Sequence, residues 1–228
     1  MNIELIQYLS QFLLENRLQT FENVLKLRTR YLTVVLEDLF QAQNASAVLR
    51  TCECFGIQDV HIIENRNKFI VHKEISMGSN KWINLHKYSS SANNSIAAIK
   101  HLREKGFRIV ATSPDPEYPL LHDFDLSLGK VALFFGTELS GISKNIVENA
   151  DEFIRIPMFG FTESFNISVS VALCLQDLVS RLHNSECNWQ LNKEDYDEIL
   201  LNWMRHSIKK VELIEKKFNK LRDTNKKL

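Results

Sequence analysis

The sequence predicts an α/β fold in which a mostly parallel sheet is covered by helices on both faces. Apolar segments of strand length alternate with helical segments, many of ten or more residues; the strands are expected at 31–37, 59–64, 81–88, 107–113, 130–136 and 153–158. Such alternation is typical of parallel sheets, because each crossover between parallel strands needs a helix. The segment "KVALFFG" is apolar almost throughout, as expected of a strand buried on both faces.

The helical segments have recognisable starts and stops. We expect an N-terminal helical stretch to about residue 30, then a helix with Asn44 in the capping position and Gly56 as its stop, and a capped helix ending at Gly106. A short helix at 144–150 and a core helix ending near His183 follow. After a polar break, one long amphipathic helix is expected, with apolar residues Ile199, Leu200, Trp203, Ile208, Val211, Ile214 and Phe218. The expected organisation is a helical extension (1–30), an α/β domain (31–183) and a basic amphipathic helix (184–228).

Composition places the chain among ordinary soluble globular proteins. It has 228 residues, of which 44% are hydrophobic and 25% charged. No apolar run approaches the ~20 residues that cross a bilayer, and the N-terminus lacks a signal peptide's basic region. The four cysteines and seven histidines lack metal-ligand spacing. We therefore expect a cytoplasmic protein with reduced thiols, no bound metal and no membrane contact.

The charge is unevenly distributed although the formal net charge is zero. Residues 205–228 contain nine Lys or Arg against three acids, and residues 17–30 contain four against one. Two basic ends around an acidic middle favour a polyanionic partner. A solvated helix face with a frayed tail is the alternative, and charge alone does not separate the two.

Three polar loops follow predicted strands, at the edge of a parallel sheet where ligands bind. They are "ATSPDP", "GTELSG" and "MFGFTESFN". The third leads into an apolar helix yet carries Ser164, Asn166, Ser168 and Ser170, whereas a helix cap needs one of them. No G-x-G-x-x-G or Walker A motif is present, so a dinucleotide or NTPase site has little support. The extra polar groups predict a different ligand site.

Two charged residues lie beside this edge. Arg50 stands nearly two turns after Asn44 beside apolar neighbours, and an arginine in a core-facing helix is costly unless it is paired or opens onto an anion site. Glu138 follows a buried strand in a loop bracketed by glycines. A structural salt bridge is the alternative for Arg50, and capping of the next helix is the alternative for Glu138.

The segments "NASAVLR", "GTELSGIS" and "IPMFGFTESFNISVSVA" resemble the three motifs of the SPOUT-superfamily RNA 2′-O-ribose methyltransferases. "GSNKW" and the stretch from Arg17 to Glu37 resemble the TrmH branch, the tRNA guanosine-18 2′-O-methyltransferases. The resemblance covers roughly Arg17 to Arg181. It implies a SPOUT α/β knot, a deep trefoil that is a rare exception to unknotted topology, with helical extensions at both ends.

The resemblance also implies a cofactor, a partner copy and site residues. S-adenosyl-L-methionine would be held by loop backbone groups at Thr112, Gly136, Ile156 and Phe165, in a homodimer with helices packed across each site. The catalytic set would be Arg50 with Asn44, Glu138, Ser164 and Asn166, while Arg28, Arg30, Lys209 and Lys210 are expected to bind RNA. Because a guanidinium is a poor base, Arg50 either polarises the ribose hydroxyl or acts with an RNA phosphate.

The favoured substrate is tRNA, at the D-loop guanosine. Methylation of rRNA or of the tRNA wobble nucleotide is the second interpretation, and a non-catalytic RNA-binding homologue is a third. Two local departures bear on this choice: Phe165 stands where the family usually has Leu, and "FQAQNAS" lacks the Pro-His that often precedes the motif Asn. The N-terminal arm is also less basic than expected of a tRNA binder, so RNA affinity is expected to lie more in the C-terminal helix.

Overall fold

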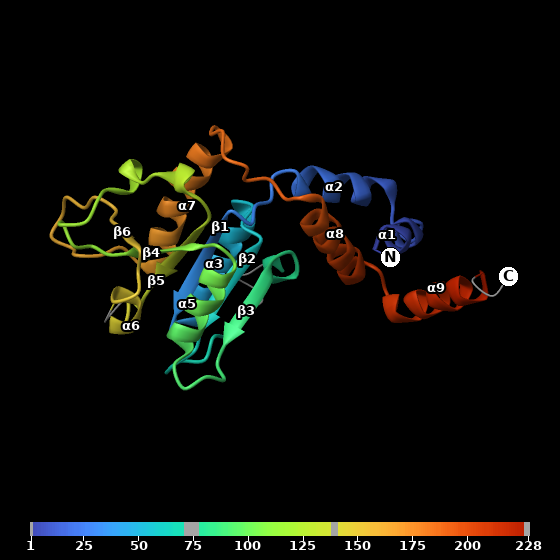
Figure 1. Ribbon diagram of the computed structural model, residues 1–228, viewed down its shortest axis with the longest axis horizontal. Coiled ribbons are helices and arrows are strands. Elements are labelled where there is room, and N and C mark those ends of the chain that lie inside the picture. The colour runs from blue at the N-terminus through green and yellow to red at the C-terminus, as the bar shows by residue number, and fades with distance from the viewer. Residues whose placement is uncertain (1, 71–77, 138–140, 226–228) are drawn as a thin grey trace. The chain divides into compact units, whose positions relative to one another are not determined.

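The computed structural model describes residues 2–70, 78–137 and 141–225. The chain divides into two compact units. One comprises Thr29–Trp189, and the other combines Met1–Arg28 with Gln190–Leu228. The elements of both are labelled in Figure 1.

The larger unit is built on a six-stranded sheet with the order β3-β2-β1-β5-β4-β6. All neighbouring strands in it are parallel, as predicted. The strands are β1 (Leu32–Glu37), β2 (Asp59–Ile63), β3 (Asn84–Tyr88), β4 (Arg108–Thr112), β5 (Val131–Phe135) and β6 (Glu152–Ile154). Strand β6 is shorter than expected, because Arg155 pairs instead with Leu120 and Pro157 has no amide proton to donate.

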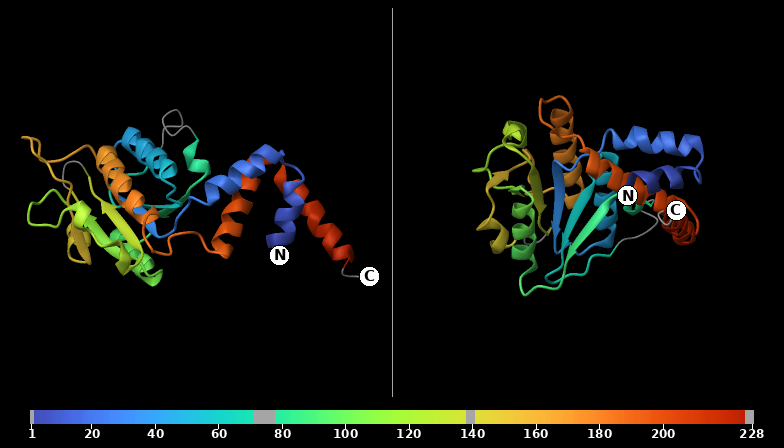
Figure 2. Two further views of the ribbon diagram at one scale, coloured as in Figure 1. Left: turned by 90° about the horizontal axis from the view of Figure 1, so that it is seen from above. Right: turned by 45° about the vertical axis from the view of Figure 1, so that its right-hand side comes forward.

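Helices cover both faces of this sheet. They are α3 (Ala42–Cys54), α5 (Asn94–Glu104), α6 (Lys144–Val147) and α7 (Ile167–His183), with short 3-10 turns η1 (Ser79–Lys81), η2 (Leu121–Asp123) and η3 (Leu126–Leu128). Figures 1 and 2 show α3 and α7 on one face and α5 on the other. Successive strand residues point to opposite faces, so Val34 joins the core under α3 and α7 while Val35 joins the core under α5 and α6.

The predicted capping role of Asn44 is wrong. Helix α3 begins at Ala42, so Gln41 holds the cap position, and its side chain makes no capping bond. Asn44 lies within the first turn and is 7% exposed. Its side chain is therefore available for contacts other than capping.

The described residues of the smaller unit form four helices, α1 (Asn2–Ser10), α2 (Glu15–Leu25), α8 (Lys193–Ser207) and α9 (Val211–Asn225). Aromatic contacts link the two ends of the chain: Tyr8 packs on Phe218 and Phe21 on Trp203, with ring centroids 5.1 and 5.6 Å apart. The terminal segments, expected as separate extensions, thus fold together.

The single C-terminal helix expected from the sequence is two helices. Trp203 and Ile208 are five residues apart, which on a straight helix rotates them by roughly 140° from each other. A break lets both side chains be buried, at 3% and 8% exposure. In this break Ile208 is extended and Lys210 adopts a left-handed conformation with φ of 56°.

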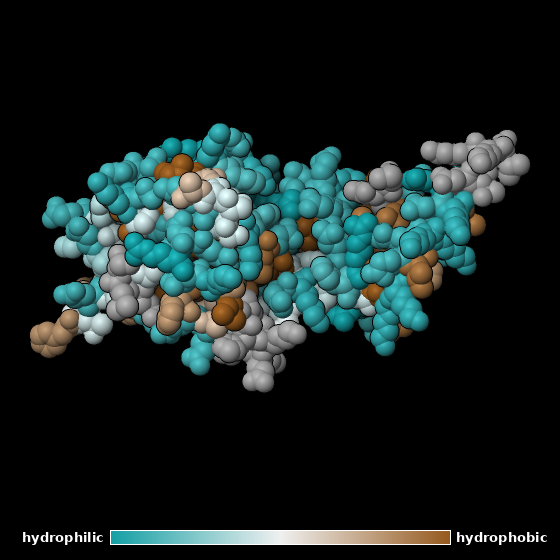
Figure 3. Space-filling view, turned by 90° about the horizontal axis from the view of Figure 1, so that it is seen from below, coloured by the Kyte–Doolittle hydropathy of each residue, from teal (hydrophilic) through white to brown (hydrophobic). Residues whose placement is uncertain are grey.

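The described ranges contain neither a helix suited to a membrane nor a cluster of metal ligands. No helix there is long and apolar enough to cross a bilayer. No three or more His, Cys, Asp or Glu side chains of the described segments are placed to hold a metal ion. All four cysteines are free thiols. On the face shown in Figure 3, hydrophilic side chains predominate and hydrophobic ones form separate patches.

Candidate functional site at the carboxyl edge of the sheet

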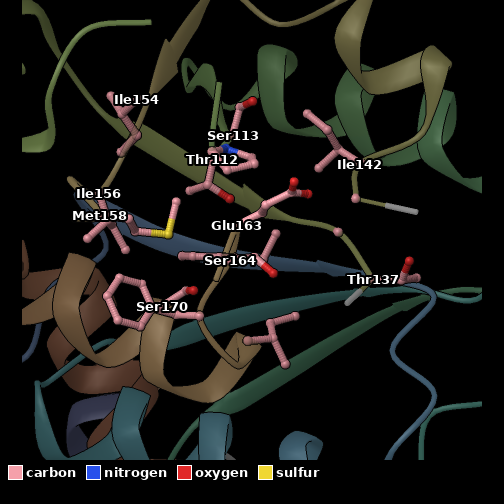
Figure 4. Close-up of a pocket in the computed structure, with 16 residues that line it drawn as sticks. Thr112, Ser113, Thr137, Ile142, Ile154, Ile156, Met158, Glu163, Ser164 and Ser170 are labelled. Atoms are coloured by element: carbon pink, nitrogen blue, oxygen red, sulfur yellow. The ribbon is translucent and has the colours of Figure 1, made fainter. Parts of the chain in front are cut away.

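A cavity of about 470 Å³ lies beyond the carboxyl ends of β4, β5 and β6. The segments that line it come from all three predicted loops (Figure 4). Its lining residues are Thr112, Ser113, Pro114, Phe135, Gly136, Thr137, Gly141, Ile142, Ile154, Ile156, Met158, Glu163, Ser164, Phe165, Ile167 and Ser170. The four predicted cofactor residues, Thr112, Gly136, Ile156 and Phe165, all belong to this set. We call this space the first cavity; the roles of its residues remain predictions.

The wall after β5 requires glycine. A Cβ on Gly136 would lie 2.1 Å from the backbone carbonyl atoms of Gly141, closer than real Cβ atoms come. Thr137 and Gly141 exchange two backbone hydrogen bonds of 2.9 and 3.0 Å, and Gly141 has φ of 64°. Two chain segments therefore meet at backbone contact beside the cavity. Glu138, predicted as a site residue, lies outside the described residues.

The polar groups at the start of α7 have distinct roles. Asn166 caps the helix: its side-chain oxygen accepts from the amide of Ser168 at 2.9 Å and from the Ser168 hydroxyl at 2.6 Å. Ser164 and Ser170 instead line the first cavity. Capping thus explains Asn166 and Ser168, and the other two serines lie where a ligand would bind.

An amide pair joins two of the motifs. The Asn166 side-chain nitrogen donates to the Asn44 side-chain oxygen at 3.2 Å, although the residues are 122 positions apart. The Asn44 nitrogen in turn donates to Gln41 at 3.1 Å. The pair holds the first turn of α3 against the start of α7.

Arg50 is exposed on α3, so the expected cost of burying its charge does not arise. Among the described residues it has no ion-pair partner, and the structural salt bridge therefore finds no support there. The side chain is free to meet an anion from solution, but it lines none of the cavities described here.

The predicted RNA contacts differ in their availability. Arg28 is 1% exposed and lies over the Trp203 ring at 5.3 Å, so its predicted contact with RNA conflicts with its burial. Arg30 pairs with Asp59 at 2.9 Å and is mostly covered. Lys209 and Lys210 are exposed in the break between α8 and α9.

The pair between Arg30 and Asp59 belongs to a cluster of titratable groups on β2 and β3. Burial opposes ionisation of Asp59, but a hydrogen bond from His86 and the charge of Arg30 outweigh it and lower the pKa of Asp59 to about 2. Burial, with a smaller contribution from His86, lowers the pKa of His61 to about 3. His61 is therefore neutral in the folded protein, with its Nδ1 atom 2.9 Å from the Tyr88 hydroxyl.

Sequence reasoning missed several residues of the first cavity, including Ser113, Met158 and Glu163. All three lie in the loops singled out above, so their position after a strand was the available signal. Figure 4 shows Glu163 and Ser164 side by side in the cavity. Nothing in the sequence pattern separated these from their neighbours.

A parallel sheet with a ligand-sized cavity at its carboxyl edge, walled by three loops and a helix start, defines an α/β protein that binds a small molecule there. Comparison with known proteins specifies the class. The sequence profile of the SpoU rRNA Methylase family matches residues 31–176. The chain belongs to this family, and the trefoil knot is what family membership implies for the fold.

Two curated relatives and one solved structure illustrate the similarity. The chain is 43% identical over 214 residues to a tRNA (guanosine(18)-2′-O)-methyltransferase of Borreliella burgdorferi, covering 94% of this chain and 96% of the relative. It is 32% identical to the enzyme of the same name from Thermus thermophilus, covering 84% and 97%. The crystal structure of the A. aeolicus TrmH/SpoU tRNA modifying enzyme superposes with a TM-score of 0.75 at 30% identity, covering 86% and 98%.

Proposed function

We propose that this protein transfers a methyl group from S-adenosyl-L-methionine to the 2′-hydroxyl of guanosine 18 in tRNA. The observation that carries the proposal is the 43% identity over 94% of the chain to a relative bearing that name. The motif residues Gly136, Ser164 and Phe165 also meet in one cavity. A transferase acting on tRNA agrees with the exposed basic residues of the C-terminal segment.

The first cavity fits the cofactor by its chemistry. Ile154, Ile156 and Phe165 provide apolar surface for an adenine ring. The described lining contains no lysine or arginine and one carboxylate, that of Glu163, so it accepts a positively charged ligand. When bound, S-adenosyl-L-methionine supplies an activated methyl group on a cationic sulfur.

The chain's own residues contribute position and electrostatics, which supply much of the acceleration in such reactions. The pair of Asn44 and Asn166 fixes α3, which carries Arg50, against the start of α7. We assign Arg50 to the ribose hydroxyl, where its charge would stabilise the oxygen while the proton passes to an RNA phosphate or to water. Because Arg50 lines neither cavity of its own chain, it would act at the site of the partner copy in the homodimer proposed below. Ser164, at the cavity wall, would orient the ligand without adding charge.

The active form is proposed to be a cytoplasmic homodimer. Large apolar side chains on and before α7 remain exposed: Phe159 is 97% exposed, Val169 43% and Leu173 38%. A second copy packed on α7 would cover these side chains; contiguous apolar patches mark such interaction sites. Sedimentation analysis of the intact protein would give twice the chain mass; a monomer at assay concentrations would exclude this form.

The activity is tested with labelled S-adenosyl-L-methionine and unmodified tRNA or rRNA in parallel, followed by nuclease digestion and mass spectrometry. We expect 2′-O-methylguanosine at position 18 of tRNA. Label in rRNA or at the wobble nucleotide would retain the chemistry and replace the target. A protein that binds no cofactor would refute the proposal altogether.

The role of Arg50 is tested separately. Arg50→Ala should abolish methyl transfer while leaving the cofactor affinity and the unfolding midpoint near wild type, because the side chain is exposed. Arg103→Ala is the control, since Arg103 is also an exposed arginine but pairs with Asp151 at 2.8 Å. Loss of folding in Arg50→Ala would make Arg50 structural.

A further inference from the structure

A second cavity, of about 950 Å³, adjoins the first at the carboxyl edge of the sheet. The two share Thr137, Gly141 and Ile142 in their walls. The second cavity lies beyond β1 and β2 and beside the boundary between β1 and β5, where the strand order reverses. Its lining is Glu37–Gln41, Asn44, Asn65–Asn67, Ala92, Asn93, Thr137 and Gly141–Asn145. A reversal of this kind is a usual place for ligands.

Two buried carboxylates fix the walls of the second cavity. Glu37, 3% exposed, accepts hydrogen bonds from the hydroxyl of Ser95 and from the amide and hydroxyl of Ser143, at 2.5, 2.8 and 2.7 Å. Asp38 accepts from the amides of Asn65 and Arg66, both at 2.7 Å. The carboxylates of Glu37 and Asp38 are hydrogen-bonded to the surrounding loops, so a ligand would contact other groups of the lining.

The backbone at Asp38, which holds one of these loops, is strained. Its φ is 51°, a left-handed conformation that non-glycine residues rarely adopt. Its carbonyl accepts from the side chain of Asn67 at 2.9 Å. Strain of this kind persists where the surroundings over-determine it, and it is concentrated at functional sites.

The rim carries an aromatic ring and a cation. Phe40 is 78% exposed although it is large and apolar. Arg66 is exposed, and among the described residues its guanidinium has no ion-pair partner. The other cation in the lining, Lys144, pairs with Glu148 at 3.4 Å. An exposed ring and a guanidinium without an ion-pair partner among the described residues thus line one cavity. This combination suits a base with its phosphate, because RNA bases stack on aromatic side chains and arginine binds phosphate in a fork.

The lining of the second cavity is also rich in side-chain amides, which can donate to and accept from the edge of a base. Asn93 and Asn145 belong to this lining, and the side-chain oxygen of Asn93 caps α5. Asn44 belongs to the same lining and bonds to Asn166 at the start of α7, where the first cavity begins. A sugar held near Asn44 would therefore lie between the two cavities.

We propose that the second cavity receives the RNA nucleotide to be methylated, with its base stacked on Phe40 and its phosphate paired with Arg66. This inference rests on the proposed function, and it adds two side chains that bind the acceptor nucleotide, Phe40 and Arg66. The shared wall then places the ribose next to the first cavity. A free nucleotide has the same chemistry, so the experiment includes both sources.

The test uses four variants of the full chain. Phe40→Ala and Arg66→Ala remove the two proposed contacts. Leu128→Ala and Lys130→Ala are matched controls, because Leu128 is 63% exposed and Lys130 is exposed before β5, at the opposite edge of the sheet. For each we would measure the affinity for guanosine 5′-monophosphate by calorimetry, the KM and kcat for tRNA, and the affinity for S-adenosyl-L-methionine.

We expect Phe40→Ala and Arg66→Ala each to weaken binding of the mononucleotide and to raise the KM for tRNA by about tenfold, as for loss of one stacked base or one phosphate contact. Cofactor affinity should be unchanged in all four variants. Wild-type affinities and KM in both rim variants would overturn the inference. Weakened mononucleotide binding with unchanged tRNA kinetics would assign the cavity to a free nucleotide and also overturn it.

The measurement of mononucleotide binding distinguishes a failure of this inference from a failure of the proposed function. If no RNA is methylated but the rim variants still lose mononucleotide affinity and the controls do not, the methylation proposal fails and the nucleotide cavity stands. If tRNA is methylated normally by both rim variants, the function stands and the cavity assignment fails.

Discussion

The amide pair between Asn44 and Asn166 permits a quantitative test of how the site is held together. Asn166→Ala removes a helix cap, worth about 1 kcal/mol, and a side-chain hydrogen bond, worth about 1 kcal/mol. The expected loss in unfolding free energy is therefore about 2 kcal/mol. Asn44→Ala should also lose about 2 kcal/mol, since it removes the pair and the bond to Gln41 but no cap. The double variant should lose about 3 kcal/mol and not 4, which is a coupling of about 1 kcal/mol.

The measurement is urea unfolding of the four proteins, with hydrogen exchange of the α3 and α7 amides to assign the loss to this unit. Asn93→Ala is the matched control, because Asn93 caps α5 by accepting from the Ile96 amide at 3.1 Å but has no bond to Asn44. Its loss of about 1 kcal/mol should add to that of Asn166→Ala. If the losses of Asn44→Ala and Asn166→Ala also add, the amide pair contributes nothing and our account of the α3–α7 link is wrong.

Three further predictions follow from the same geometry. Gly136→Ala should abolish cofactor binding and lower the unfolding free energy by more than about 2 kcal/mol, because the new Cβ would lie 2.1 Å from backbone atoms that cannot shift without distorting the fold. Calorimetry would measure both effects. His61 should make the protein acid-sensitive, because its side chain takes up a proton near pH 6.5 in the unfolded state and only near pH 3 in the folded state. About 3 kcal/mol of unfolding free energy should therefore be lost between pH 7 and pH 4, which urea unfolding at each pH would measure. Replacing Lys209 by Ala and Lys210 by Asn should lower the slope of log affinity for tRNA against log salt by about 1.5 to 2, since each exposed lysine releases about one counterion.

Each of these predictions has its own control. Gly160→Ala, whose Cβ would meet nothing within 4 Å, should leave cofactor binding intact. An equal loss of cofactor binding in Gly160→Ala would show that the clash at Gly136 is not the cause. His61→Asn should flatten the acid dependence, whereas His122→Asn, at a side chain 61% exposed, should not. Asn is chosen at position 210 because it tolerates the left-handed backbone there. An unchanged salt slope would show that Lys209 and Lys210, in the break between α8 and α9, do not contact RNA.

The strands and the parallel sheet could be predicted because alternating apolar and helical segments leave few other arrangements. The loops after β4, β5 and β6 could be predicted for the same reason, since the carboxyl ends of parallel strands share one edge. The break at Ile208–Lys210 was missed because the apolar residues on either side fit one helix if the five-residue step from Trp203 is overlooked.

Other features depend on contacts between residues far apart in sequence. The burial of Arg28 against Trp203 and the pairing of Arg30 with Asp59 cannot be read from charge counts, which treat every arginine as exposed. The second cavity escaped prediction because its walls come from segments before α3, before α5 and after β5. Local pattern places Phe40 in a loop but does not show that it is exposed and lines the same cavity as Arg66.

Thr137, Gly141 and Ile142 contribute to the walls of both cavities, and this shared wall would couple the two occupancies if it responds to either ligand. A ligand that restrains this wall from one side changes the free energy of binding on the other, and by linkage the effect is equal in both directions. Cofactor and acceptor nucleotide would then each change the other's affinity through this wall, in addition to their direct contact at the methyl group. A wall that is already fixed by backbone hydrogen bonds has little freedom to lose, so the coupling through it would be small.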